Sequence, residues 1–174
     1  MKNILKLDGN EYVANTKGKS IAYFPSKKKT NSKNFGISKK TIAKLVRIYK
    51  KYQTPFRLCL HENNDEKIHY MMIVIGKKNL ANIHKHLDKD EMYFIHHGKF
   101  QIEFYENKKN KEINKKKINK VTMDKNSYQL FKLSKNNFHK TKPKSDVVIF
   151  TEIRKGPFIK TDSILLKKWN ILKL

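Results

Sequence analysis

The amino-acid sequence places His84, His86 and Glu91 close together in the segment from Gly76 to Gly98. Successive side chains of an extended strand point to opposite faces, so the two histidines, separated by one residue, would share a face. A short turn after them would return the Glu91 carboxylate to the same side. Imidazole and carboxylate groups suit Zn, Fe, Ni or Mn, so the segment holds three of the ligands that a divalent metal needs. On spacing alone, two solvated histidines are the simpler interpretation, because the pattern His-x-His is common.

A second segment, Ser134-Lys-Asn-Asn-Phe-His139, follows the strand-like residues 128–133 and changes this interpretation. The two segments together resemble the two motifs of the cupin family. The first motif of that family is Gly, a spacer, His-x-His, three or four residues, Glu, six residues and Gly, and the second is Pro-x-Gly-x-x-His. The residues that fall on the family's positions are His84, His86, Glu91, Gly98 and His139.

The resemblance implies an all-β fold, the cupin double-stranded β-helix barrel of two antiparallel sheets. In such a barrel His84, His86, Glu91 and His139 would surround one divalent metal ion, whether Zn, Fe, Mn or Ni. Four protein ligands on an ion of this kind leave open positions for water or substrate, as in catalytic sites.

The second motif departs from the family at two residues, because Ser134 stands where Pro is usual and Asn136 where Gly is usual. Asn is the non-glycine residue that best tolerates a positive φ, so we expect the turn before His139 to be kept. Gly76 also lies further upstream than the usual spacing, which indicates a longer first turn.

Further segments narrow the resemblance to the WbuC family of cupin-fold metalloproteins. They are Arg57-Leu-Cys-Leu-His61, Ile68-His-Tyr-Met71, Glu152-Ile-Arg-Lys-Gly-Pro-Phe158 and Trp169. Members of that family are associated with gene sets for cell-surface polysaccharide such as O-antigen. The resemblance implies a metal-binding protein of lipopolysaccharide-type polysaccharide or nucleotide-sugar metabolism. An isomerase-type enzyme and a non-enzymatic sugar-binding protein both fit it, and whether the chain is an enzyme stays open.

Arg57 and His61 would share one face of a strand, and the resemblance makes them ligand-binding or structural polar residues of the pocket. A guanidinium group holds a phosphate or carboxylate bidentately, which suits an anionic small molecule such as a nucleotide-sugar. The alternative is that Arg57 pairs with Glu91 or Glu152 inside the fold. Glu152 is also a candidate for holding a metal ligand from behind.

Two residues are candidates for catalytic proton transfer. His69 would project into the barrel as a base, because histidine titrates near neutral pH, although a hydrogen-bonded core histidine is the alternative. Tyr93 would line the cavity with it, and Tyr128 is expected to line the cavity as a ligand-binding residue. Core aromatic residues at the same two tyrosine positions would need no function.

The chain carries a net charge of +25, from 40 Lys and Arg against 15 Asp and Glu. Such a balance is typical of a polyanionic partner, so a basic nucleic-acid-binding module on a cupin scaffold is an alternative function. Arginine, the better reader of phosphate and guanine, is scarce beside lysine, and the lysines are spread over the whole chain. The abundance of Lys, Asn and Ile fits AT-rich codons, so nucleic acid is not the favoured partner.

The sequence lacks the motifs of several other classes of protein. The sequence has no Gly-rich phosphate loop of the Walker type and no paired zinc-finger cysteines. Cys59 is the single cysteine, so no intramolecular disulfide is available. The N-terminus has no apolar region long enough for a signal peptide, and the longest apolar run, 70–75, is too short to span a bilayer. We therefore expect a cytoplasmic protein.

The first third of the chain predicts one strand at 21–25 and one amphipathic helix at about 38–52. Ser38 is the expected N-cap of this helix. The apolar residues at helical spacing are Ile42, Leu45, Val46 and Tyr49. The predicted division is an N-terminal extension, residues 1–55, which packs on a barrel of residues 56–174 that includes a C-terminal tail.

From Phe56 onward, short strands alternate with polar turns, which is typical of a sandwich or barrel. The predicted strands are 68–75, 128–133 and 147–153, and 93–95 with 100–104 form a predicted hairpin around Gly98. Residues 107–120 hold seven lysines and are predicted to be a polar connection. The tail from Lys160 is expected to pack back on the barrel or to form a homodimer contact through Ile164, Leu165, Trp169 and Leu172.

Overall fold

The computed structural model describes residues 3–16, 21–26, 36–107 and 113–166, with residues 107 and 113–118 described by their backbone alone. Within these residues the chain forms an eight-stranded and a five-stranded sheet. The larger sheet has the order β1 (Ile4–Leu7), β2 (Asn10–Asn15), β3 (Ile21–Pro25), β4 (Phe56–Cys59), β5 (Ile68–Ile75), β12 (Val148–Lys155), β7 (Glu91–His97) and β10 (Leu130–Leu133). The smaller sheet has the order β13 (Ser163–Leu165), β6 (His84–His86), β11 (Phe138–Pro143), β8 (Phe100–Asn107) and β9 (Ile113–Met123).

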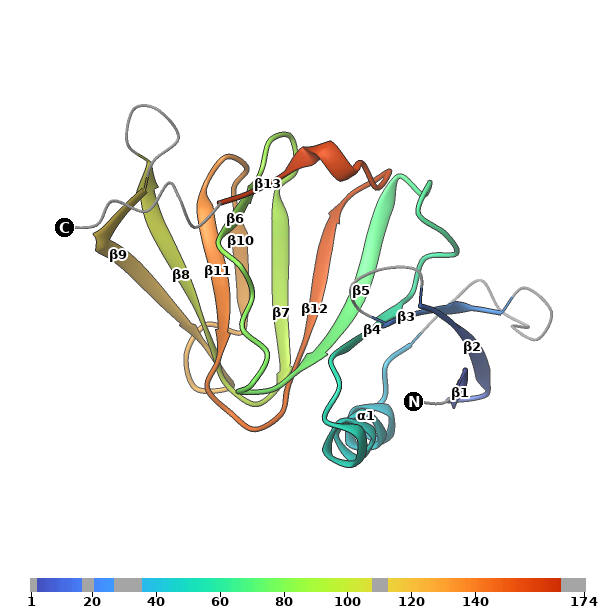
Figure 1. Ribbon diagram of the computed structural model, residues 1–174. Helices are drawn as coiled ribbons and strands as arrows, with labels where there is room; N and C mark the ends of the chain where they lie inside the picture. Colours follow the sequence, from blue (N-terminus) through green and yellow to red (C-terminus); the bar gives the residue numbers. More distant parts are fainter. Residues whose placement is uncertain (1–2, 17–20, 27–35, 108–112, 167–174) are drawn as a thin grey trace.

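Both sheets are antiparallel except at one junction, where β3 pairs in parallel with β4. In Figure 1 the strands β8, β11 and β6 of the smaller sheet lie on the left, beside β7, β12 and β5 of the larger sheet. The helix α1 and the strands β1 to β3 lie together at the other end of the molecule (Figure 1). The predicted fold class, an all-β cupin barrel with an N-terminal helical extension, is confirmed.

Helix α1 (Lys39–Tyr52) begins and ends close to where the sequence predicts. The Thr41 backbone N–H donates to the Ser38 side-chain oxygen over 3.0 Å, which caps the first turn as expected. Leu45 and Tyr49 are buried on the side that packs against the larger sheet. The helix ends at Gln53, whose φ of 51° is the left-handed conformation common at helix C-termini.

Two groups of buried apolar side chains lie on opposite faces of the larger sheet, and β5 contributes to both. Met72 and Val74 pack in the group beneath α1, whereas Ile73 and Ile75 pack against the group inside the barrel. Alternating side chains of one strand supply both groups, as a strand with covered faces requires. The predicted strand at 68–75 is β5 itself, and its apolar run is explained by these two faces.

The N-terminal region holds more strands than the sequence indicates, because β1 and β2 accompany the predicted strand β3. Leu5, Leu7 and Tyr12 of these strands are buried in the same apolar group as Leu45. The larger sheet also runs across the predicted boundary between residues 55 and 56, since β3 pairs with β4 there. The division of the chain at that boundary stays a prediction.

Two predicted connections are wrong. The strands β7 and β8 flank Gly98 but belong to different sheets, so the turn passes the chain from one sheet to the other and closes no hairpin. Most of the predicted polar connection at 107–120 is β9, which begins at Ile113 and pairs with β8. A lysine-rich segment can form this strand because β9 is at the edge of its sheet, where charged side chains are tolerated.

Within the described residues, the C-terminal tail from 160 to 166 packs back on the barrel, which is one of the two expected arrangements. In β13, Ser163 lies opposite His86 of β6, and Ile164 packs against buried Phe138. Trp169 and Leu172 lie outside the described residues, and the homodimer contact stays a prediction. None of the helices in the described part of the chain has the length and apolar character that crossing a membrane requires.

Candidate metal centre

Three histidines meet on the inner side of the smaller sheet. His84 and His86 come from β6, and His139 of the adjacent strand β11 lies directly opposite His84 in the register. One ring nitrogen from each of the three lies within 4.8 Å of those from the other two. The two motifs therefore converge, as the resemblance implies, because antiparallel pairing places residues 84 and 139 side by side.

Glu91 approaches this group from β7, which belongs to the larger sheet. Its Oε1 lies 3.0 Å from His86 Nε2, and its Oε2 lies 3.2 Å from His139 Nε2. His86, His139 and Glu91 are at most 4% exposed, so all these contacts are buried. The expected fourth ligand thus faces the histidines across the barrel and contacts two of them.

The turn before His139 has the conformation that the sequence predicts for Asn136. This residue has a φ of 64°, in the left-handed region that the family's glycine would occupy. Its backbone N–H donates to the His86 carbonyl over 2.7 Å, and its side-chain amide donates to the Leu87 carbonyl over 3.2 Å. Both bonds fasten the turn to β6, so the residue that replaces Gly also fixes His139 relative to His86.

Backbone carbonyls set the proton positions on two of the histidines. His84 Nδ1 donates to the Asn82 carbonyl over 2.8 Å, and His139 Nδ1 donates to the Asn137 carbonyl over 2.9 Å. A proton on Nδ1 leaves the lone pair on Nε2 of a neutral ring, which is the form that binds a metal. Sequence reasoning missed the two asparagines, since only their backbone takes part.

His86 is held differently, by the segment that precedes and begins β13. The Ser163 hydroxyl lies 3.0 Å from His86 Nδ1, and Asp162 Oδ2 lies 3.9 Å from the same nitrogen. The Asp162 side chain also accepts the Asp88 backbone N–H, which fastens the tail to the end of β6. These partners come from the far end of the chain, and no local signal in the sequence marks them.

An unpaired nitrogen tests whether the group fits a metal. His139 Nε2 is buried and lies 3.2 Å from Glu91 Oε2, but it has no hydrogen-bond partner among the residues that the structure describes. A buried polar atom without a partner costs free energy of about 1–3 kcal/mol. A metal ion at this nitrogen would remove that cost, so the donors present fit a divalent metal.

The electrostatics of His84 and Glu91 favour the same charge states as metal binding does. Burial, followed by the charge of His139, lowers the pKa of His84 to about 4, so its ring is neutral at pH 7. Burial tends to raise the pKa of Glu91, but the contacts with His139 and His86 outweigh it and hold this pKa well below its usual value. A neutral imidazole and an ionised carboxylate are the ligand forms that a divalent cation requires.

Behind Glu91 lies a buried polar layer. The Tyr93 hydroxyl donates to Glu91 Oε2 over 2.7 Å, so this predicted proton-transfer residue lies at the site. Arg154 of β12 places its guanidinium 3.8 Å from Glu91 and 3.5 Å from Glu152. Burial and the charge of Glu91 raise the pKa of Glu152. Arg154 was given no role from the sequence, although cross-strand pairing puts it opposite Glu91.

His69 and His61 form a pair of their own. Their rings stack with centroids 4.3 Å apart and planes 5° apart, and neither belongs to the group of three histidines. His69 Nε2 lies 3.1 Å from the Asn64 carbonyl, and the Tyr70 backbone N–H donates to His61 Nδ1 over 3.2 Å. Both rings thus have structural partners, and their predicted roles as base and ligand-binding residue stay predictions.

The remaining two predicted pocket residues lie further from the histidines. Arg57 of β4 is half-buried, and its charge opposes the upward pKa shift of Glu152, so it lies within electrostatic reach of that carboxylate. Tyr128 precedes β10, which begins at Leu130, and it is 59% exposed with its ring against Phe131. The ligand-binding roles of Arg57 and Tyr128 stay predictions.

The buried histidine pair predicts a loss of stability in mild acid. Burial is the main reason that the pKa of His61 falls to about 4, against 6.5 in the unfolded chain. Between these values the unfolded state binds the proton and the folded state does not, so stability is full above pH 6.5 and falls as the pH drops towards 4. We expect a loss of about 2–3 kcal/mol from this residue, measured by urea unfolding at several pH values.

The variant His61→Phe keeps a ring of similar shape but cannot titrate, so its stability should change less with pH over the same interval. His97→Phe, at an exposed histidine, is the matched control and should keep the wild-type slope. An unchanged slope in His61→Phe would show that the pair does not carry this effect.

Comparisons with known proteins find one family model and several distantly similar solved structures. A family model described as a domain of unknown function (DUF6016) matches residues 55–117. None of the curated proteins matches the chain. Among solved structures, CapF with the inhibitor 3-isopropenyl-tropolone is 14% identical, with a TM-score of 0.49, over 66% of this chain and 31% of that one.

Two further structures are similar to the same degree. CapF from Staphylococcus aureus, a capsular polysaccharide assembling protein, is 15% identical over 59% of this chain and 27% of that one, with a TM-score of 0.48. Oxalate decarboxylase from Bacillus subtilis, studied for its Mn(II) centres, is 13% identical over 60% of this chain and 25% of that one, with a TM-score of 0.45. The chain thus spans less than a third of the length of these three proteins.

Proposed function

We propose that the chain is a metal-binding cupin protein whose divalent ion is held by His84, His86, His139 and Glu91. The observation that carries this proposal is the orientation of the histidines, since two of them are anchored through Nδ1 and the buried Nε2 of His139 lacks a partner. Three imidazoles and one carboxylate suit Zn, Fe, Mn or Ni. A metal in this position would polarise a carbonyl or hydroxyl oxygen of a bound substrate.

The proposed ligand is an anionic sugar derivative such as a nucleotide-sugar, in cell-surface polysaccharide metabolism. The resemblance of the sequence to the WbuC family supports this choice. The positive charges near the site support an anionic ligand as well. Arg154 lies beside Glu91, and the charge of Arg57 lowers the pKa of Glu152. Guanidinium groups bind phosphate and carboxylate with paired hydrogen bonds, which lysine cannot do.

Among the protein's own groups, Tyr93 is the better placed for proton transfer. Its hydroxyl proton is held by Glu91 Oε2, at the edge of the histidine group, whereas His69 stacks on His61 and bonds to a backbone carbonyl. Burial and then the charge of Glu91 raise the pKa of Tyr93, so the hydroxyl keeps its proton at neutral pH. In an isomerase-type reaction it would donate that proton, and in a sugar-binding protein it would donate a hydrogen bond.

The test is metal analysis of the purified protein, followed by a thermal-shift screen. The screen compares intact nucleotide-sugars with the corresponding free nucleotides and free sugars. The proposal expects one divalent ion per chain and stabilisation by at least one intact nucleotide-sugar, because a ligand that binds only the folded state raises the melting temperature. Protein that is free of metal after growth and after incubation with each of the four metals would contradict the metal site. A metal-loaded protein that no nucleotide-sugar stabilises would contradict the ligand class only.

Arg57→Lys separates a ligand-binding role of this residue from a structural one. If Arg57 clamps the anion, the variant should fold and keep its metal but bind the best nucleotide-sugar of that screen about 10-fold more weakly, or about 1.4 kcal/mol. If Arg57 is instead a buried partner of Glu152, the variant should lose stability and keep its ligand affinity. A melting curve and a calorimetric titration decide between the two, and unchanged values in both would remove Arg57 from the site.

A further inference from the structure

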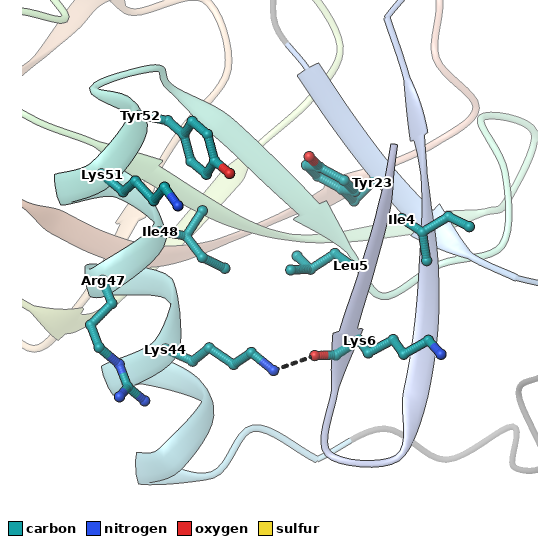
Figure 2. Close-up of a pocket in the computed structure, with 9 residues that line it drawn as sticks. All are labelled: Ile4, Leu5, Lys6, Tyr23, Lys44, Arg47, Ile48, Lys51 and Tyr52. Carbon is teal, nitrogen blue, oxygen red and sulfur yellow. Dashed lines mark hydrogen bonds between the residues drawn. The ribbon is translucent and has the colours of Figure 1, made fainter. Parts of the chain in front are cut away.

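A second cavity lies outside the barrel, between helix α1 and strand β1. It has a volume of about 700 Å³ and none of the metal-site residues line it. Figure 2 shows the helix on one side and β1 on the other, with Tyr23 of β3 at the back. Cavities that hold small molecules have volumes of about 300–1,000 Å³, so this one has the size of a ligand site.

Cations surround this cavity. Lys44, Arg47 and Lys51 line it from α1, and no carboxylate is among its lining residues. Lys6 lines it from β1, but Figure 2 shows the Lys6 side chain extending away from the helix. Figure 2 shows the Lys44 side chain extending across the cavity, where its Nζ donates to the Lys6 carbonyl over 2.7 Å. That bond joins the two walls and fixes one positive charge at the cavity edge.

The acidic residues nearby neutralise little of this charge. Lys6 has a weak ion pair with Glu11, with 3.9 Å between Nζ and Oε2. Asp8 is engaged elsewhere, because it accepts hydrogen bonds from the Ser38 and Thr41 side chains. Arg47 forms no ion pair with any residue in the described part of the chain, so its guanidinium keeps its donors for another partner.

The walls of the cavity are apolar. Leu5 is buried and Ile48 packs against the same apolar group, while Ile4 is 47% exposed at the rim. Tyr23 and Tyr52 add two aromatic rings, which Figure 2 shows on the side away from Lys44. The cavity therefore combines an aliphatic and aromatic surface with cations at both ends, Lys44 at one end and Lys51 beside Tyr52 at the other.

We infer that this cavity is a binding site for a small amphipathic anion, in which one phosphate or carboxylate head is joined to an apolar body. The head would lie between Arg47 and Lys44, and the body would cover Ile48 and Tyr52. Scattered surface lysines alone would not give this arrangement, because here Lys44, Arg47 and Lys51 line one concave apolar surface without a carboxylate in its lining. The site is separate from the proposed metal centre and does not rest on it.

Calorimetric titration with octyl phosphate, butyl phosphate, inorganic phosphate and adenosine monophosphate tests the inference. Octyl phosphate should bind at least 10-fold more tightly than butyl phosphate, because each buried methylene group adds to the affinity, and inorganic phosphate should be weakest. Higher salt should weaken all of them, since the head is bound by exposed cations. Tighter binding of adenosine monophosphate than of octyl phosphate would identify the body as an aromatic base and keep the site.

Arg47→Gln and Lys44→Gln should each lower the affinity at least fivefold, and Lys50→Gln, at an exposed position on the same helix outside the cavity, should change it less than twofold. Circular dichroism melting curves check that the variants fold. Equal binding of inorganic phosphate and octyl phosphate would overturn the inference, as would no binding or equal losses in Arg47→Gln and Lys50→Gln.

Discussion

Replacing His86 by alanine should abolish stoichiometric metal binding and lower the stability of the metal-loaded protein by about 4 kcal/mol, the value for an ion present at about 1,000 times its dissociation constant. His86 supplies one of the histidine nitrogens and contacts Glu91 over 3.0 Å. Without it, the Glu91 carboxylate stays buried with fewer partners, which adds to the loss. Metal analysis and urea unfolding of the same samples measure both effects.

A chelator provides the internal control for this prediction. Removal of the metal should lower the melting temperature of the wild type and leave that of His86→Ala unchanged, because the variant has no ion to lose. His97→Ala is the matched substitution, at an exposed histidine that ends β7 outside the group of three. It should keep its metal and its response to the chelator, and full metal occupancy in His86→Ala would contradict the assignment.

Replacing Gly98 by alanine should destabilise the protein by about 3 kcal/mol or more, through two effects at the crossing from β7 to β8. Gly98 has a φ of 79°, which costs an alanine about 1–2 kcal/mol. An added Cβ would also lie 2.3 Å from the Val147 carbonyl oxygen, so the backbone would have to move. Because β7 carries Glu91, the shift should weaken metal binding as well.

Gly9 offers a matched control, since its φ is also 79° but a Cβ built on it meets no atom within 4 Å. Gly9→Ala should therefore cost only about 1–2 kcal/mol and leave the metal in place. Urea unfolding of the two variants separates backbone strain from the steric clash. Equal destabilisation by the two substitutions would show that the contact with Val147 does not constrain the crossing.

The two histidine motifs could be recognised from the sequence, but the groups that orient them could not. His84, His86 and His139 follow a linear pattern, and Asn136 carries a local signal because few residues tolerate its positive φ. The Nδ1 partners of His84 and His139 are backbone carbonyls, which any residue supplies. The Nδ1 partners of His86 are Asp162 and Ser163, which lie far away in the sequence. The local spacing of residues does not predict such long-range contacts.

The errors in the predicted fold have related causes. The Gly98 turn resembles a hairpin turn in sequence, because the signal for a sharp reversal is the same whether the next strand stays in the sheet or leaves it. The lysines of β9 hide its apolar alternation at Val121 and Met123, so that its sequence resembles a polar connection. Strands β1 and β2 are short and depend on packing beneath α1, which local propensity does not register.

The most direct test of the metal assignment is the anomalous scattering of a crystal of the metal-loaded protein, measured at the absorption edge of the metal found by analysis. The account predicts one strong peak per chain, at about 2.0–2.3 Å from Nε2 of His84, His86 and His139 and from a Glu91 carboxylate oxygen. A peak bound elsewhere, or a metal-loaded crystal in which His139 Nε2 bonds to water or protein instead, would contradict it.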